Sequence, residues 1–261
     1  MGNFGYGDTS HAVLTGTPEP SFLLTLHVPY DGFPPDEVHR EVETMYAWLA
    51  DLDRSTTIDL QTPIEDADGR LCQIHQLPNG LPVVCTVQRW VPGQDLVKDG
   101  EPVELDSETL ASVGRMLRQV HAHGAEWARS TTPQRIRPDP MIDVAEVGTD
   151  TWGSRKERNA TSEELALLER TVSQIVQARE SSREPWGMAH GDFRATNCVE
   201  FEGQIKPIDF DLCTLTYQFD DLGWFLRDLK NQESCKVFLD GYHKAGPEIP
   251  EIVRQVEGAF I

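Results

Sequence analysis

The sequence predicts an α+β fold in two parts, a small sheet with one helix followed by a larger, mainly helical region. Short apolar or alternating runs bounded by Gly, Pro and Asp fill the first 90 residues. The turn-rich stretch "VPGQDL" follows at residues 91–96, and beyond it apolar residues recur at helical spacing. We therefore divide the chain into a reduced N-terminal lobe, residues 1–90, and a C-terminal lobe, residues 91–261.

Three strands and one helix are expected in the N-terminal lobe. The strands are "SFLLTLHV" (21–28), "RLCQIHQL" (70–77) and "PVVCTVQRW" (82–90). A helix over residues 36–50 is predicted by the spacing of Val38, Val42, Met45, Tyr46 and Leu49. The following stretch "DLDRSTTIDL" is expected to be an ordinary solvent-facing connection, with a substrate loop as the alternative.

The C-terminal lobe is expected to hold three helices and one hairpin. The first helix starts at Asp106 or Ser107 as N-cap and ends before Gly124. A second helix opens with the capping box "TSEE" at 161–164 and continues to about residue 176. The hairpin joins "CVEF" to "QIKPI" through a Glu-Gly turn at 202–203, and the last helix, "DDLGWFLRDL" at 220–229, is capped by Asp220 or Asp221.

Composition favours an ordinary globular protein and argues against two classes of partner. The 261 residues are 39% hydrophobic, and no apolar run reaches the roughly 18 residues that span a bilayer, so we expect a cytoplasmic protein. A net charge of −20 disfavours nucleic acid and anionic membranes, whose phosphates require Lys and Arg. The five cysteines form no CxxC pair, which favours reduced thiols over a zinc site or disulfides.

Two loops carry the residues that point to a reaction. The segment "AHGDFRATN" (189–197) places Asp192 five positions before Asn197, and "PIDFD" (207–211) supplies Asp209 at the end of an apolar strand. The predicted hairpin lies between them, so its two strand ends bring the three side chains to one edge. Mg²⁺ prefers oxygen ligands and is usually held by one or two protein side chains together with substrate phosphates. Asn197 and Asp209 fit a Mg²⁺ site, and Asp192 is left to orient or deprotonate a substrate hydroxyl.

The same spacing is found in protein kinases, where a catalytic-loop Asp is followed by Asn at the fifth position and a later Asp-Phe pair binds metal. "HGDFRATN" and "IDFD" resemble the aminoglycoside phosphotransferase and choline kinase family. The segments "FLLTLHVP", "HREVETMYAWL", "TPIEDADGR", "VQRWVPGQDL", "VGRMLRQVHAHG" and "YQFDDLGWFL" follow in the order that this family shows. The pair "IDFD" and "DDLGWFL" is most similar to the branch of homoserine-kinase-like enzymes and a stress-response Ser/Thr kinase.

This resemblance implies a bilobal protein-kinase-like fold with ATP and Mg²⁺ between the lobes. It makes Asp192 and Asn197 catalytic, with Asn197 and Asp209 as metal ligands, and makes Asp221 a brace for the catalytic loop. The hinge that meets adenine through its backbone would be "TVQRW" (86–90), with Gln88, Arg89 and Trp90 at its end. His190 is interpreted as a residue that orders the loop.

The sequence departs from the family where a strand Lys or Arg should contact the phosphates. Thr25 in "FLLTLHVP" stands there, and no Lys precedes Lys98. His27 shares a strand face with Thr25 and is one substitute, with a structural hydrogen bond as the alternative. Glu41 is the expected partner on the helix because it lies nearer the apolar stripe than Glu43 does. The expected phosphate-covering turn, "GYGDTS" (5–10) ahead of "HAVL", carries a single Gly-x-Gly motif with little chain before it. A small or trimmed N-terminal lobe is therefore expected.

Two functions from different classes follow. The first is an ATP- and Mg²⁺-dependent phosphotransferase, supported by the intact set of Asp192, Asn197 and Asp209. The second is a pseudokinase or nucleotide sensor, favoured by the loss of the strand cation at Thr25. The acceptor is a small-molecule hydroxyl, of the aminoglycoside, homoserine, choline or macrolide kind, or a Ser/Thr side chain. Its pocket is expected from residues 125–160 and from the helices after residue 220.

Overall fold

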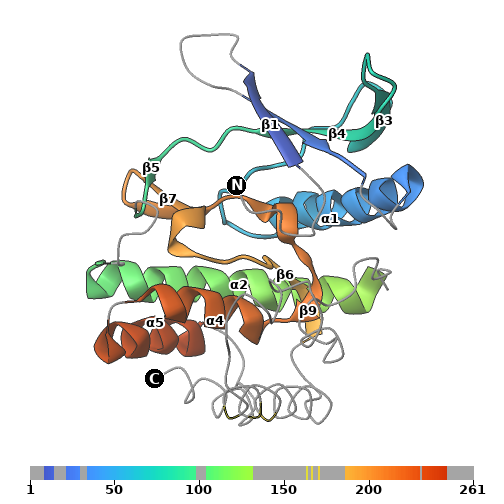
Figure 1. The fold of residues 1–261 in the computed structure, drawn as a ribbon. Helices are drawn as coiled ribbons and strands as arrows, with labels where there is room; N and C mark the ends of the chain where they lie inside the picture. The colour runs from blue at the N-terminus through green and yellow to red at the C-terminus, as the bar shows by residue number, and fades with distance from the viewer. Residues whose placement is uncertain are drawn as a thin grey trace.

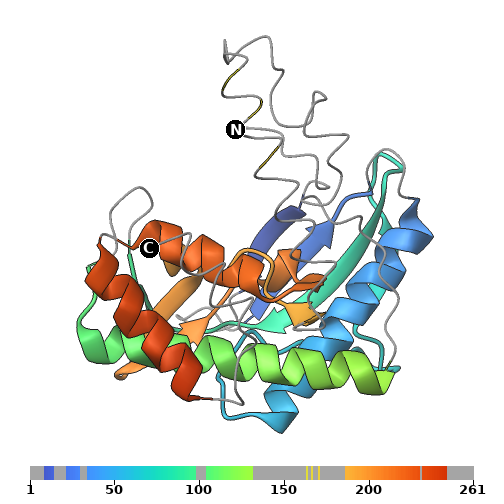
Figure 2. The same cartoon turned by 90° about the horizontal axis from the view of Figure 1, so that it is seen from below.

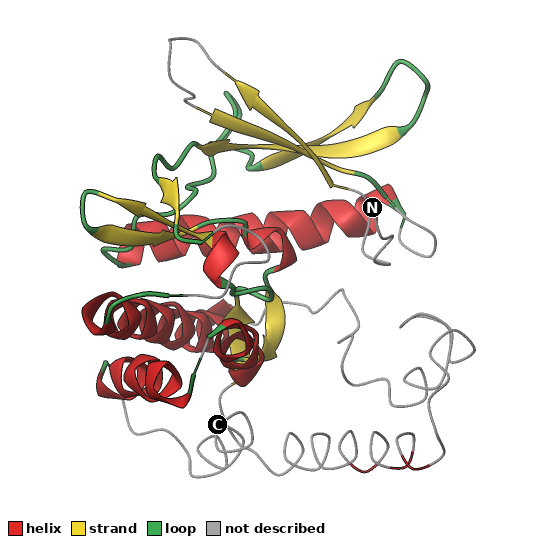
Figure 3. Ribbon diagram, turned by 60° about the vertical axis from the view of Figure 1, so that its left-hand side comes forward, coloured by secondary structure: helices red, strands yellow, loops and turns green. Residues whose placement is uncertain are grey.

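The structure, a computed structural model, describes residues 9–14, 22–29, 34–97, 104–131, 186–229 and 231–245, and the single positions Glu163, Ala166 and Arg170. A four-stranded antiparallel sheet lies above the helices in Figure 1. Figure 3 shows the same division, with α1 directly under the sheet and the remaining described helices below it. The α+β, two-part architecture predicted from the sequence is confirmed.

The N-terminal sheet has the strand order β1-β2-β4-β3. Its strands are β1 (Thr9–Leu14), β2 (Phe22–His27), β3 (Cys72–Gln76) and β4 (Pro82–Arg89). The last three agree with the predicted strands to within two residues at each end. β1 contains the "HAVL" that was expected to follow the phosphate-covering turn, and residues 5–8 of that turn lie outside the described residues.

Helix α1 (Pro35–Ser55) is confirmed and runs five residues beyond its predicted end at residue 50. Residues 51–60 were expected to be a solvent-facing connection, but the first half of this segment is the end of α1 and the segment faces solvent only in part. Leu52 and Leu60 are fully buried and Ile58 is 8% exposed. These three residues belong to the hydrophobic core. On the same helix, the indole Nε1 of Trp48 donates to Nδ1 of His123 in the C-terminal lobe across 3.1 Å.

Helix α2 (Ser107–Thr131) begins as predicted, because Asp106 Oδ1 accepts the backbone N–H groups of Glu108 (2.9 Å) and Thr109 (3.0 Å). The helix does not end at Gly124, as the sequence suggested, but continues to Thr131. A Cβ at position 124 would lie 1.9 Å from the carbonyl oxygen of Met188. Gly124 is therefore the site where a strand backbone crosses α2, and its lack of a side chain serves packing.

Two short sheets position the loops of interest. β6 (Trp186–Ala189) pairs with β9 (Thr214–Tyr217), and neither strand was predicted. The predicted hairpin is confirmed as β7 (Cys198–Phe201) and β8 (Gln204–Pro207). Its turn residues, Glu202 and Gly203, both have positive φ angles, 53° and 77°, which is typical of two-residue hairpin turns. β5 (Gln94–Asp95) adds a third strand beside β7.

Two further helices complete the described part. α4 (Phe219–Asp228) matches the predicted last helix, but its N-cap is Gln218, so the prediction of Asp220 or Asp221 as cap is wrong. α5 (Gln232–Lys244) was not predicted and packs against α2 (Figure 2). The predicted helix at 161–176 lies outside the described residues, apart from three helical positions, Glu163, Ala166 and Arg170.

Two expectations from composition can be compared with the structure directly. All five cysteines are free thiols in the structure, which confirms the expectation of reduced cysteines. Four of them are buried, and burial raises the pKa of the Cys72 thiol to about 12. Among the described helices, none combines the length and the apolar character needed to cross a membrane.

Candidate active site

The loop after β6 is ordered by His190, whose side chain is fully buried. Its Nε2–H donates to the carbonyl oxygen of Ile208 (2.9 Å), and its Nδ1 faces the backbone N–H of Asp192 (3.4 Å). The ring lies 4.4 Å from that of Phe210, centroid to centroid. His190 thus ties the Asp192 loop to the segment that carries Asp209, which fits the loop-ordering interpretation of this residue.

Gly191 brings the same two segments into close contact. Its φ of +83° is in the left-handed region, and a Cβ there would lie 2.1 Å from the carbonyl oxygen of Leu212. No side chain fits in that space. A glycine at this position therefore lets the Asp192 loop lie directly against the 3₁₀ turn that follows Asp209, Phe210–Leu212.

Asp221 anchors this loop from α4 and has no exposed surface. Its Oδ2 accepts the backbone N–H of His190 and its Oδ1 that of Gly191, both at 2.8 Å, while His121 Nε2 lies 3.0 Å from Oδ2. Burial opposes the charge, but these hydrogen bonds hold the pKa of Asp221 below its ordinary value. The brace implied by the family resemblance is present.

Burial favours the neutral form of the histidine beside Asp221. Desolvation by complete burial lowers the pKa of His121, despite the nearby carboxylate. Its Nδ1 lies 2.8 Å from the hydroxyl of Tyr242, so a neutral ring can donate from Nε2 to Asp221 and accept at Nδ1 from Tyr242. The pair extends the brace from α4 through α2 to α5.

Asp192 and Asn197 are in direct contact. Asn197 ends the 3₁₀ turn Ala195–Asn197, and its Nδ2 donates to both the backbone oxygen (2.8 Å) and the Oδ2 (3.1 Å) of Asp192. With the amide nitrogen turned to Asp192, the amide oxygen of Asn197 is the atom suited to a cation. Burial raises the pKa of Asp192, and the charge of Asp209 raises it further. Asp192 is therefore a better proton acceptor than an exposed aspartate.

The hairpin brings Asp209 to the same edge as Asp192 and Asn197. The backbone N–H of Ile208 donates to the oxygen of Asn197 (2.9 Å), which sets Asp209 one residue beyond a paired position. The carboxylate of Asp209 is exposed, and its field acts on Asp192. The structure thus gathers Asp192, Asn197 and Asp209 at one edge of the hairpin, as the sequence predicted.

The donor set at this edge suits a hard divalent cation that also binds phosphate. A carboxylate and an amide oxygen are the kind of ligands that Mg²⁺ takes. In the described part of the chain, no group of three or more His, Cys, Asp or Glu residues gathers into a metal site of its own. Two protein ligands with remaining positions for phosphate oxygens and water fit this arrangement better than an all-protein cage does.

Two charged residues near this edge were not singled out from the sequence. Arg194, two positions after Asp192, lowers the pKa of Asp192 by its charge and forms an ion pair with Asp228 at 3.2 Å. Asp211, the second aspartate of "IDFD", is 9% exposed, and its charge adds to the effect of burial in raising the pKa of the Tyr46 hydroxyl. Their positions inside the two motifs were a usable signal, because both lie within two residues of a predicted site residue.

The three N-terminal residues predicted near the phosphates are buried under the sheet. Thr25 and His27 face the same side of β2, with 0% and 3% exposure, and Glu41 on α1 is 5% exposed. His27 Nε2 lies 3.4 Å from Thr86 Oγ1, and Thr86 Oγ1 lies 2.9 Å from the Tyr46 hydroxyl. Around the position where the sequence led us to expect a cation, the described structure has hydroxyl groups and an imidazole.

The end of β4, predicted as the hinge, is fixed by the segment before Ile64. The backbone N–H of Arg89 donates to the oxygen of Thr62 (2.8 Å), and its guanidinium contacts Asp59 Oδ1 at 2.5 Å. The side chain of Gln88 is buried and donates to the oxygen of Gln61 (3.4 Å). The partly buried Trp90 is the first residue after the strand.

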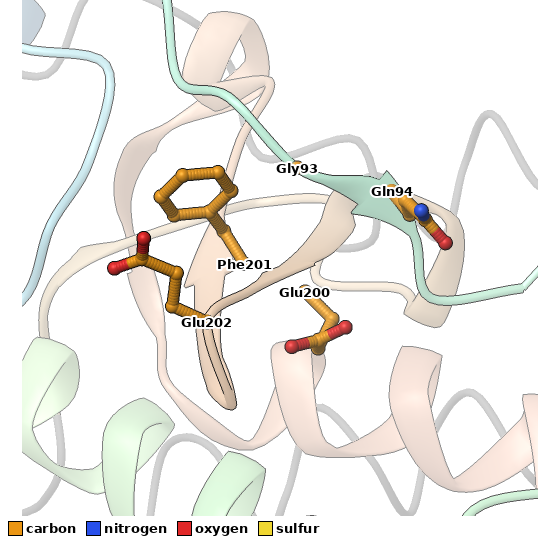
Figure 4. A pocket seen from close by; sticks show the side chains of 5 residues that line it. All are labelled: Gly93, Gln94, Glu200, Phe201 and Glu202. Atoms are coloured by element: carbon orange, nitrogen blue, oxygen red, sulfur yellow. The ribbon is translucent and has the colours of Figure 1, made fainter.

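A pocket of about 280 Å³ lies beside the hairpin turn. It is lined by residues of β5 and β7 and of the segments next to them (Figure 4): Gly93, Gln94, Glu200, Phe201 and Glu202. None of the residues gathered at the hairpin edge lines it. This pocket is distinct from the Asp192 site.

Known proteins share the sequence pattern and the fold of this chain. A model of the phosphotransferase enzyme family matches residues 5–253. The chain belongs to this phosphotransferase family. It is accordingly an enzyme of the kinase type, and the family resemblance drawn from the sequence is confirmed. A sequence search of curated proteins finds no match.

Solved structures share the fold of this phosphotransferase. A microcompartment-associated aminopropanol kinase is 22% identical with a TM-score of 0.68, and 97% of this chain and 80% of that chain are covered. An amicoumacin kinase in complex with AMP-PNP and Ca²⁺ is 15% identical with a TM-score of 0.66, over 96% and 76% of the two chains. Choline kinase from Cryptosporidium parvum Iowa II is 13% identical with a TM-score of 0.55, over 99% and 80%. The structural similarity establishes the kinase-like fold, and sequence identities this low leave the acceptor open.

Proposed function

We propose that this phosphotransferase moves the γ-phosphate of ATP, with Mg²⁺, to a hydroxyl group of a small molecule of the aminoglycoside, homoserine or choline kind. The observation that carries the proposal is the contact between Asn197 and Asp192 at the hairpin edge that also holds Asp209. A nucleotide with its divalent cation would supply the transferred phosphoryl group and neutralise the charge that develops on it.

Asp192 is the residue proposed to meet the acceptor. Its carboxylate is partly buried, its pKa is raised, and Asn197 fixes one of its oxygens, so the group is both oriented and basic. A positioned carboxylate of this kind orients the attacking hydroxyl and accepts its proton. His190 and Asp221 keep the loop in place and do not contact the reacting atoms.

Asn197 and Asp209 are the proposed metal ligands. Asn197 presents its amide oxygen because its amide nitrogen is bonded to Asp192, and Asp209 presents an exposed carboxylate. Asn197 directly precedes β7 and Asp209 closely follows β8, so both lie at the same end of the hairpin. Backbone pairing between the two strands therefore fixes their separation. This rigidity favours a site of defined size.

The nucleotide would lie between the sheet and the hairpin, with its phosphates toward Thr25, His27 and Glu41. Since Thr25 supplies no charge, we propose that the metal site contributes more to holding the phosphates than it does in kinases with a strand Lys. The adenine would meet the backbone near Trp90, because the N–H of Arg89 is already bonded to Thr62.

Replacing Asp209 by Asn tests the metal assignment. We expect turnover to be lost and nucleotide affinity to fall at least roughly tenfold when Mg²⁺ is present, since a ligand charge is removed. In EDTA the variant and the wild type should bind nucleotide equally weakly. Isothermal titration with AMP-PNP measures both conditions. An equal loss of affinity in EDTA would show that Asp209 contacts the nucleotide directly or supports the fold.

The acceptor class can be found by a screen with purified enzyme. Labelled ATP and Mg²⁺ are incubated with a panel of amino alcohols, homoserine, aminoglycosides, macrolides and Ser/Thr peptides, and phosphorylated products are separated and identified. The names of the similar kinases, aminopropanol and choline among them, support amino alcohols as the first group to test. The net charge of −20 is compatible with a cationic acceptor.

Nucleotide binding without transfer to any acceptor would favour the alternative, a nucleotide sensor with little turnover. The observation behind that alternative is Thr25 in place of the strand cation. A cytoplasmic location and the lack of nucleic-acid or membrane partners stay predictions from the sequence.

A further inference from the structure

Gln61 reaches from the N-terminal lobe to the backbone of the proposed metal ligand. It follows the buried Leu60 in the connection after α1 and is itself 7% exposed. Its Oε1 accepts the backbone N–H of Asp209 across 2.7 Å, although the two residues are 148 positions apart. The predicted site did not include Gln61, which directly follows the segment 51–60 that was expected to face solvent.

The backbone of Gln61 is itself held in place. Its carbonyl oxygen accepts the amide of the Gln88 side chain (3.4 Å), and the next residue, Thr62, accepts the backbone N–H of Arg89 (2.8 Å). The side-chain oxygen of Gln61 is thus presented to Asp209 from a segment attached to the end of β4. Because this segment is bonded to a strand, the hydrogen bond from Gln61 restrains Asp209 more than a hydrogen bond from a freely moving loop would.

Asp209 needs such a restraint because of its backbone conformation. Its φ and ψ are 62° and 59°, in the left-handed region that residues with a Cβ seldom adopt. Among the described non-glycine residues, Glu202 in the hairpin turn is the other with positive φ. Strained conformations at functional positions persist where the surroundings hold them. In this conformation the Asp209 carboxylate lies where its charge acts on Asp192.

We propose that Gln61 is a positioning residue that holds Asp209 in its left-handed conformation and thereby sets the metal affinity of the site. This inference rests on the proposed function, because it takes Asp209 as a metal ligand. Gln61 acts through the Asp209 backbone and does not itself contact metal or nucleotide. Groups that orient metal ligands in this way commonly change metal affinity about 10–100-fold when they are replaced.

Gln61→Met tests the proposal because methionine has a similar length and volume and no strong acceptor. We expect the Mg²⁺ concentration for half-maximal binding of AMP-PNP to rise roughly tenfold. In EDTA, AMP-PNP affinity should equal that of the wild type. If the Met variant does not fold, Gln61→Asn, whose shorter side chain withdraws the acceptor, is measured in its place.

Gln73→Met is the matched control, since Gln73 is a partly buried glutamine on β3 whose amide contacts Asp66 away from the hairpin edge. Its Mg²⁺ dependence should equal that of the wild type. An unchanged Mg²⁺ dependence in Gln61→Met, with the wild type responding to Mg²⁺, would overturn the role of Gln61 alone. If the wild type binds AMP-PNP with the same affinity with and without Mg²⁺, both the proposed metal site and this inference are overturned.

Discussion

The Asp192→Asn variant is expected to lose about 10²–10⁴-fold in kcat while its affinity for Mg·ATP stays within a few-fold of the wild type. The change removes a proton acceptor and preserves the size of the side chain. Asn197 can still donate to the backbone oxygen of residue 192 and to the new amide oxygen, so the loop should keep its shape. Steady-state kinetics with the identified acceptor and nucleotide titration measure the two quantities separately.

Asp240→Asn is the control for charge alone. Asp240 lies on α5 with a side chain that is 70% exposed, and its partner is Lys244 at the helix surface. Its replacement should leave kcat unchanged. If Asp192→Asn keeps near-full activity while this control behaves as expected, the acceptor hydroxyl does not depend on Asp192 and the proposed role is wrong.

The Asp221→Asn variant is expected to lose about 1–3 kcal/mol of folding free energy, the usual cost of leaving a buried hydrogen-bonding group unsatisfied. Both carboxylate oxygens of Asp221 accept hydrogen bonds from the Asp192 loop, and His121 approaches Oδ2 as well. An asparagine would turn an NH₂ group toward at least one of these donors, which leaves buried polar groups unsatisfied. Urea denaturation followed by circular dichroism measures the free energy of unfolding.

Asp220→Asn is the matched comparison because it lies one residue earlier on α4. Its Oδ2 accepts from the hydroxyl of Thr216 (3.0 Å), and its side chain is only partly buried. We expect it to lose no more than about 1 kcal/mol. If the two variants lose similar stability, the brace between α4 and the catalytic loop is not the main source of order at this loop.

The catalytic edge could be predicted from the sequence because its signals are local. Asp192 and Asn197 are five residues apart in one loop, and Asp209 follows a hairpin that the Glu-Gly turn already indicates. Backbone pairing then places the strand ends together without any long-range information. The hairpin register confirms this step, with Cys198 opposite Pro207.

Gln61 could not be found in this way. Its contact with Asp209 joins one side chain to a distant backbone N–H, and such a contact leaves no periodic pattern or motif in the sequence. The neighbouring segment "DLDRSTTIDL" was expected to be a solvent-facing connection, whereas its residues Leu52, Ile58 and Leu60 are buried. Burial of a polar loop depends on the tertiary partner, which single-sequence reasoning does not include.

Gly124 shows a different limit. A glycine after a helical apolar stripe commonly marks the end of the helix, and the sequence was interpreted so. The structure instead uses Gly124 to admit the backbone of Met188, a strand residue that neither propensity nor periodicity predicted. β6 and β9 have four residues each, which is too short for an alternating pattern to stand out.

The most direct test of the account is a calorimetric titration of AMP-PNP into the wild-type protein, once with Mg²⁺ and once with EDTA. Asn197 and Asp209 offer oxygen ligands at one edge of the hairpin, while Thr25 gives the phosphates no fixed cation. We therefore expect the affinity for AMP-PNP to fall by roughly tenfold or more when Mg²⁺ is removed. Equal affinity in Mg²⁺ and EDTA would contradict it, because the nucleotide would then be held without the metal site on which the proposed reaction depends.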